Sequence, residues 1–311
     1  MERREEWIAA TRNKYPLDAA LFGTMGAVSA KLCADVSRDF IGKQFEFMDT
    51  SKYEEIRDVA RMNQVYWRET LFRVYWAAAL NLLRHQRWQA GCIRAFKAPA
   101  SLLSFAASLR GLLEASLDVT YSLRPVPYTL ADNQMMVESA LAGSLQQFFV
   151  IEELENRLIH FVYGRKVARA DKIAIPTTHV ALEPKDYRNA ADLPEGDRES
   201  FSELYDELCG LCHPTAFSLA FLWNEKRRGD ATTVHITADE DERKIRNLCQ
   251  KHEKAIEFAM SLSVTGSALC LKTLNWFSLP EVGCPSIERW NFDDIPAWRK
   301  AQERLSTRLI H

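Results

Sequence analysis

The sequence predicts a mainly α-helical protein, a multi-helix bundle with one small β-hairpin. Prolines and glycines are scarce, 11 and 12 in 311 residues, so long stretches contain no helix breaker. Within these stretches apolar residues recur at steps of three and four positions, as they do on one face of an α-helix. Only residues 217–237 combine alternation with β-branched side chains, and this segment predicts the hairpin.

The composition is that of an ordinary folded protein. Hydrophobic residues make up 47% and charged residues 26%, with a formal net charge of −2, which disfavours both disorder and a wholly basic surface. The first residues mix acids and bases without an apolar run, so no export signal is expected. The longest apolar run, residues 258–271, is too short to span a membrane. We therefore expect a cytoplasmic protein without membrane contact, with seven free cysteines.

Prolines and capping residues set the expected helix boundaries. Pro16 suits the first turn of a helix over residues 16–39, and Pro99 that of a helix over 99–123. Thr50 and Ser51 can cap a helix over 53–97, which no proline interrupts. The remaining elements are expected as a break at 124–127, a helix over 130–168, a loop over 169–194, a helix over 195–212 stopped by Pro214, strands at 217–223 and 232–237, a helix over 239–276 and a short helix in the tail.

We expect one helical-bundle domain over residues 1–280, because helices with one apolar face must bury it against each other. Its N-terminal helices lie in residues 1–48 and its core in 49–280. A tail over 281–311 carries Trp290 and Trp298, which are expected to pack on the bundle or on a second subunit.

Motifs for metal and cofactor chemistry are missing from the sequence. It contains no Glu-x-x-His pair, no His-Glu-x-x-His zinc motif and no Gly-x-Ser-x-Gly elbow. Cys209-Gly-Leu-Cys212-His213 matches the haem-attachment pattern, but no second ligand pair has the spacing of a zinc site. We expect core thiols followed by a helix-ending His-Pro, and we expect no cofactor and no metal.

Three charged residues form a stripe on the helix expected over residues 99–123. Arg110, Glu114 and Asp118 fall at i, i+4 and i+8 on a helix that is otherwise largely apolar. Buried charges cost free energy unless they are paired. The stripe therefore predicts either an ion pair that fixes helix packing or one wall of a polar pocket.

The pattern Arg110-x-x-x-Glu114, followed by Tyr205-x-x-Leu208-Cys209-x-x-x-His213-Pro214 and a hairpin, resembles uncharacterised helical bacterial proteins. These are related to the HEPN-like (higher eukaryotes and prokaryotes nucleotide-binding) domains, and the resemblance covers residues 50–275. It implies a role in stress, toxin or antiphage-defence biology. It also adds Tyr205 and His213 to the candidate pocket residues.

HEPN proteins that cleave RNA carry Arg-x(4–6)-His, often with a polar residue after the arginine, and act without a metal at a dimer interface. Arg246, Asn247 and His252 fit this pattern, with His252 as general acid or base and Arg246 as the cation that stabilises phosphate charge. Arg–His pairs of similar spacing also end at His235 and His311, as chance predicts, so only Asn247 distinguishes this one. The alternative is a solvated helix face.

Basic segments are candidates for RNA binding. The candidate nucleic-acid-binding residues are Arg84, Arg87, Arg94, Lys226, Arg227 and Arg228. His85, Trp88 and Lys97 accompany the first three, and Arg165, Lys166, Arg169 and Lys172 form a further basic segment. Cations at helix ends and turns are also common as solvated charges.

The leading interpretation is a HEPN-like helical protein with metal-independent ribonuclease activity, with RNA, a second copy or another protein subunit as partners. One alternative is a non-catalytic interaction or scaffold module. Another is a small-molecule-binding protein whose pocket lies at Arg110 and Glu114.

Overall fold

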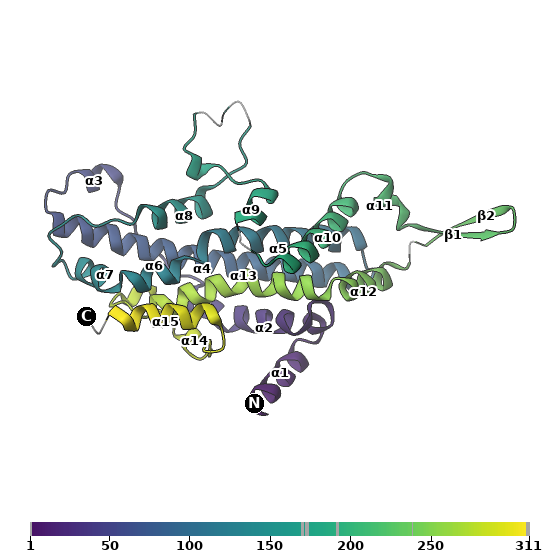
Figure 1. Ribbon diagram of the computed structural model, residues 1–311, viewed down its shortest axis with the longest axis horizontal. Coiled ribbons are helices and arrows are strands. Elements are labelled where there is room, and N and C mark those ends of the chain that lie inside the picture. The colour runs from purple at the N-terminus through teal and green to yellow at the C-terminus, as the bar shows by residue number, and fades with distance from the viewer. Residues whose placement is uncertain (1, 169–170, 172–173, 191–192, 238, 309–311) are drawn as a thin grey trace. The chain divides into compact units, whose positions relative to one another are not determined.

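The structure, a computed structural model, describes residues 2–168, 171, 174–190, 193–237 and 239–308. Its helices and antiparallel hairpin confirm the predicted fold class (Figure 1). In chain order the elements are α1 (Glu2–Lys14), α2 (Pro16–Phe40), α3 (Thr50–Glu54), α4 (Val59–Phe96), α5 (Leu102–Leu123), α6 (Val126–Asp132), α7 (Gln134–Leu141), α8 (Glu152–Tyr163), η1 (Thr177–His179), α9 (Pro184–Ala190), α10 (Glu195–Cys212), α11 (Ala216–Ala220), β1 (Trp223–Arg228), β2 (Ala231–Ile236), α12 (Asp241–Lys251), α13 (Glu253–Leu274), η2 (Pro280–Val282), α14 (Pro285–Glu288) and α15 (Pro296–Arg308).

The chain divides into two compact units, each assembled from three segments. Unit 1 comprises residues 1–33, 84–117 and 192–263, and unit 2 comprises residues 34–83, 118–191 and 264–311. Each has its own aromatic core. In unit 1, Phe22 stacks on Phe105 with 6.3 Å between ring centroids. In unit 2, Trp67 stacks on Phe149 at 5.2 Å.

Prolines set several helix ends where the sequence predicts them. α2 begins at Pro16 and kinks at Gly23, whose φ of 67° is a left-handed conformation that glycine adopts readily. α10 ends before His213, because a residue that precedes proline, here Pro214, avoids helical geometry. The break expected over residues 124–127 is shorter, because only residues 124–125 separate α5 from α6, which begins at Val126.

Two carboxylates, rather than Thr50 and Ser51, cap the helices near the start of the predicted 53–97 helix. Asp49 accepts a hydrogen bond from Ser51 N at 2.9 Å before α3. Asp58 accepts from Ala60 N at 2.9 Å and fixes the start of α4. The prediction of one helix over 53–97 is therefore wrong at its N-terminal end.

The prediction of one helix over residues 130–168 is also wrong, because a loop at 142–151 separates α7 from α8. Asn63 Nδ2 donates to the carbonyl oxygens of Leu145 (3.1 Å) and Gln147 (2.8 Å), and Asn63 Oδ1 accepts from Phe149 N (2.9 Å). Trp67 Nε1 donates to Phe149 O at 2.9 Å. These tertiary hydrogen bonds pair with backbone N–H and C=O groups of the loop, which would pair with each other if the segment were helical.

The hairpin is present, but its first strand lies later than predicted. β1 spans Trp223–Arg228, so the basic residues expected in the turn are strand residues. The expected strand over residues 217–223 mostly forms α11 and the turn after it. β2 lies within one residue of its predicted range.

Other boundaries differ more locally. The Ala98–Pro99 peptide bond is cis and α5 begins at Leu102, where Asp241 Oδ2 accepts from the backbone N–H at 2.8 Å. The expected helix over 239–276 is divided at His252 into α12 and α13. α1 lies within residues 1–48, where N-terminal helices are expected, although its bounds are not predicted, and η1 and α9 lie within the expected loop over 169–194. The described residues do not include 169–170, 172–173 and 191–192 of that loop, nor residue 238.

The tail packs within unit 2. Trp290 and Trp298 are buried, and Trp298 lies 5.2 Å from Trp276 between ring centroids. Asp39 at the end of α2 accepts from Ser286 N (2.6 Å) and Ser286 Oγ (2.8 Å). These contacts hold residues 284–286 against α2.

Among the described residues, two helices are long and apolar enough to cross a membrane by length and composition, α2 and α13. In α13, 67% of the most apolar window is buried, and in α2 44%. For α13 this is the burial that the sequence predicts for residues 258–271.

All seven cysteines are free, as predicted, and five of them are buried: Cys33, Cys92, Cys249, Cys270 and Cys284. Burial raises the pKa of each of these five thiols, because an apolar environment disfavours the thiolate. These cysteines therefore behave as core side chains.

His85 is also a core side chain, although the sequence groups it with surface cations. It is fully buried on α4, and its Nδ1 lies 2.9 Å from Ser263 Oγ on α13. Burial lowers the pKa of His85 to about 4. A histidine in an unfolded chain titrates near 6.5.

We expect His85 to make stability pH-dependent between pH 6.5 and 4. In this window His85 is protonated in the unfolded chain but stays neutral in the folded protein. The free energy of unfolding therefore falls as the pH falls, by up to about 1.4 kcal/mol per pH unit. Urea unfolding at several pH values measures the slope. His85→Asn should reduce it whatever its overall stability, whereas the exposed-site control His235→Ala should keep it. Equal slopes for His85→Asn and the wild type would contradict this assignment.

Candidate functional site

Four of the predicted polar residues meet in unit 1 on α5 and α10. Glu114 Oε1 accepts from Arg110 Nε at 3.0 Å and from Tyr205 Oη at 2.9 Å. Arg110 Nη2 lies 3.5 Å from Tyr205 Oη, and Arg110 Nη1 lies 3.5 Å from His213 Nε2. We call Arg110, Glu114, Tyr205 and His213 the polar cluster.

Local sequence explains how each helix presents its part of the polar cluster. Arg110 and Glu114 are one turn apart on α5, the spacing at which side chains of opposite charge pair. His213 follows the last turn of α10 in an extended conformation (φ −91°, ψ 151°), which Pro214 enforces. Its imidazole is therefore displayed beyond the helix, and it is exposed.

The cluster combines a fixed cation with an accessible imidazole. Burial disfavours the charge of Arg110, but Tyr205, Cys209 and Glu114 outweigh it and raise the pKa of the guanidinium. Burial and the hydrogen bond to Glu114 raise the pKa of Tyr205, so its phenol stays neutral. The Arg110 guanidinium, which only donates hydrogen bonds, lies 3.5 Å from the imidazole of His213. Such an arrangement can stabilise an anion beside a proton acceptor.

Asp118, the third residue of the predicted stripe, belongs to unit 2. There its carboxylate favours the charged form of His160, whose pKa is nevertheless lowered by burial. Cys209 and Cys212 lie beside the polar cluster in unit 1. Burial raises the pKa of Cys212, which Arg110 opposes. No group of three or more His, Cys, Asp or Glu residues with the geometry of a metal site occurs within the described part of the chain.

Arg246, Asn247 and His252 have separate surroundings. Arg246 is exposed, pairs with Glu242 at 2.9 Å and lies 4.7 Å above the ring of Phe96. Asn247 is exposed. His252 is buried at the end of α12, and its Nε2 donates to Glu207 Oε2 at 2.9 Å.

Glu207 on α10 is the partner that sequence analysis missed. It binds both His252 and Lys251. Burial opposes its ionisation, but these two hydrogen bonds lower the pKa of Glu207 below its ordinary value. No sequence signal pairs Glu207 with a residue 45 positions later.

The predicted RNA-binding cations of α4 and the hairpin all belong to unit 1. Arg87 and Arg94 are exposed on α4, as are Lys226, Arg227 and Arg228 on β1, whereas Arg84 is half-buried. In unit 2, Arg165 and Lys166 are exposed, and Arg169 and Lys172 lie outside the described residues.

Trp88, the aromatic residue that the sequence places among the basic residues of α4, lies next to the cluster's helix. Trp88 is exposed and packs so closely on Gly111 that a Cβ there would meet its ring at 2.8 Å. Glycine at position 111 therefore allows the indole to lie against α5 beside Arg110. The contact between Trp88 and α5 is what the sequence did not predict, although a glycine often marks a close approach between helices.

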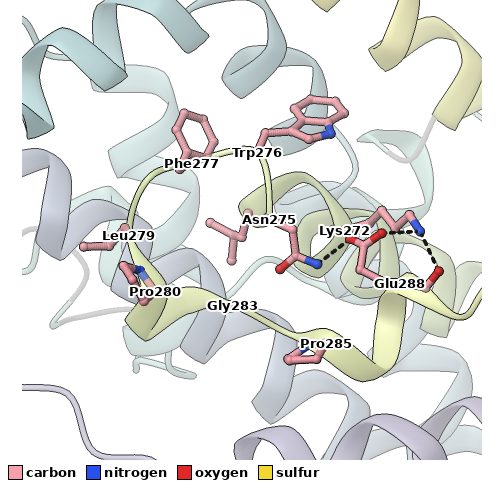
Figure 2. A pocket seen from close by; sticks show the side chains of 10 residues that line it. Lys272, Asn275, Trp276, Phe277, Leu279, Pro280, Gly283, Pro285 and Glu288 are labelled. Atoms are coloured by element: carbon pink, nitrogen blue, oxygen red, sulfur yellow. Dashed lines mark hydrogen bonds and ion pairs between the residues drawn. The ribbon is translucent and has the colours of Figure 1, made fainter.

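Unit 2 contains a pocket of about 550 Å³ at the end of α13 (Figure 2). Lys272 Nζ donates to Glu288 Oε2 at 3.0 Å, and Asn275 exchanges hydrogen bonds with the backbone of Cys284 (2.8 and 3.2 Å). Trp276 and Phe277 are among the apolar lining residues. Its main polar side chains thus hold residues 284–288 in place, and the sequence-predicted candidates lie elsewhere.

We expect His252 to be a stabilising residue through Glu207. His252→Ala removes a charge-assisted hydrogen bond at a buried position, so the free energy of unfolding should fall by about 1–3 kcal/mol in urea denaturation. His235→Ala, at an exposed position, should change it by less than about 0.5 kcal/mol. If His252→Ala is as stable as the wild type, the bond to Glu207 contributes nothing.

Comparison of the chain with protein-family models, with curated proteins and with solved structures finds no match. The resemblance to HEPN-like helical domains therefore rests on the short motifs around Arg110, Glu114, Tyr205 and His213-Pro214.

Proposed function

We propose that this protein cleaves RNA without a metal, at the polar cluster. One observation carries the proposal: the Arg110 guanidinium lies between the Glu114 carboxylate, at 3.0 Å, and the exposed His213 imidazole, at 3.5 Å. A cation and a neutral base side by side are the groups that RNA transesterification needs. The motifs that carry the HEPN-like resemblance also contain these residues.

The proposed reaction uses groups of this chain alone. The His213 imidazole takes the proton of the ribose 2′-hydroxyl, whose oxygen attacks the adjacent phosphorus. Arg110 stabilises the added negative charge on the phosphate oxygens, and Glu114 keeps the guanidinium oriented. As the bond from phosphorus to the 5′-oxygen breaks, the His213 imidazolium returns its proton to the departing oxygen. The products are a 2′,3′-cyclic phosphate and a 5′-hydroxyl.

The resemblance extends the proposal to biological context. By analogy with HEPN-like proteins, this chain would be a cytoplasmic toxin or antiphage-defence component that acts as a homodimer. A ribonuclease of this kind should arrest growth when it is expressed, and His213→Ala should relieve the arrest.

We expect the purified protein to cleave a labelled single-stranded RNA in EDTA. Arg110→Ala and His213→Ala should each slow cleavage by about 100-fold or more, because each removes a group that acts in the transition state. His179→Ala, in unit 2, is the matched control and should cleave as the wild type does. Mass spectrometry of the fragments should show the cyclic phosphate, and circular dichroism checks that each variant is folded.

Two outcomes would overturn the proposal. If the wild type binds RNA but leaves it intact, the protein is a binding module. If folded His252→Ala or Arg246→Ala loses cleavage while His213→Ala retains it, the activity belongs to the residues of the HEPN motif and not to the polar cluster.

A further inference from the structure

The hairpin β1–β2 presents an entirely exposed surface. Every residue from 224 to 236 is exposed, including Val234 at 57% and Ile236 at 80%. A two-stranded hairpin is marginally stable alone in water. The hairpin must therefore be held at its base.

Three contacts hold that base to the helices of unit 1. Lys244 Nζ on α12 donates to the carbonyl oxygens of Phe221, before β1, and of Thr237, after β2. Thr237 N donates to Leu222 O at 2.8 Å, which closes the ladder. The ring of Phe217 packs on Gly210, where a Cβ would meet it at 2.6 Å, so α11 lies against the last turn of α10. The polar cluster and the hairpin are thus joined through unit 1.

The strand register separates the hairpin into two different faces. Residues opposite each other in an antiparallel pair share a face, and successive residues alternate. One face carries the pairs Trp223–Ile236, Glu225–Val234 and Arg227–Thr232. The other, which we call the basic face, carries Asn224–His235, Lys226–Thr233 and Arg228–Ala231. Two acidic residues lie at the ends of the hairpin: Glu240 at the base accepts from Asn224 at 3.4 Å, and Asp230 lies in the turn.

We propose that the basic face binds the phosphodiester backbone of single-stranded RNA as it leaves the polar cluster, an inference that rests on the proposed ribonuclease function. Its six positions carry two cations and several hydrogen-bond donors, and the carboxylate of Glu225 lies on the opposite face. Lys226 and Arg228 are two residues apart, about 6.8 Å along the strand, a spacing close to that of successive phosphates in an extended strand. Duplex RNA fits less well, because its major groove is too deep and narrow for such a ribbon.

Adjacent arginines on opposite faces provide a matched test. On a His213→Ala background, which preserves the RNA, we expect Arg228→Ala to weaken binding of a fluorescent single strand severalfold. For this variant, the plot of the logarithm of the binding constant against the logarithm of the salt concentration should be less steep by about 0.7. That change corresponds to the loss of one phosphate contact. Arg227→Ala removes the same charge one residue away and should keep the slope. Lys226→Ala should behave like Arg228→Ala, and unlabelled duplex should compete more weakly than unlabelled single strand.

The outcomes separate this inference from the proposed function. If RNA binds but Arg227→Ala and Arg228→Ala weaken it equally, the assignment to the basic face is wrong while the ribonuclease proposal stands. If duplex competes as well as single strand, the proposed substrate class is wrong. If His213→Ala and the wild type both fail to bind RNA, the ribonuclease proposal fails and takes this inference with it.

Discussion

The Glu114 carboxylate is the constraint on which the polar cluster depends. A single oxygen, Oε1, accepts from both Arg110 and Tyr205, and so joins α5 to α10. Without it, a partly buried guanidinium would lose its counter-charge and the Tyr205 phenol would lose its acceptor. The position of Arg110 beside His213 follows from that oxygen, since Glu114 is the carboxylate that pairs with the guanidinium. The proposed chemistry at the cluster therefore depends on a residue that need not touch a substrate.

Patterns within short stretches of the sequence predicted that the fold is helical. They also predicted those helix ends that a single residue sets by its own covalent geometry. Pro16 starts α2, and Pro214 stops α10. Ends set by tertiary contacts were missed. Periodicity supports a helix through residues 142–151, but Asn63, some 80 positions earlier, satisfies the backbone there. A pattern read within a window of the chain contains no information about such a partner.

The residues of the candidate site also divide into contacts that the sequence predicted and contacts that it could not predict. The spacing of Arg110 and Glu114 predicted their pairing, because four residues make about one helical turn. The contact of that pair with Tyr205 and His213 was suggested by a resemblance and requires two helices to pack in one register. The faces of the hairpin could not be predicted, because placing β1 six residues too early put Lys226 and Arg228 in a turn, where side chains do not alternate.

The buried thiols give the protein internal reporters of its own motions. Cys33, Cys92 and Cys249 lie in unit 1, and Cys270 and Cys284 lie in unit 2. An alkylating reagent reacts with the thiolate, which burial suppresses in each, so modification must wait until the surrounding segment opens. Peptide mapping after timed labelling would then rank the opening rates of the two units in the unmodified chain, with no probe introduced.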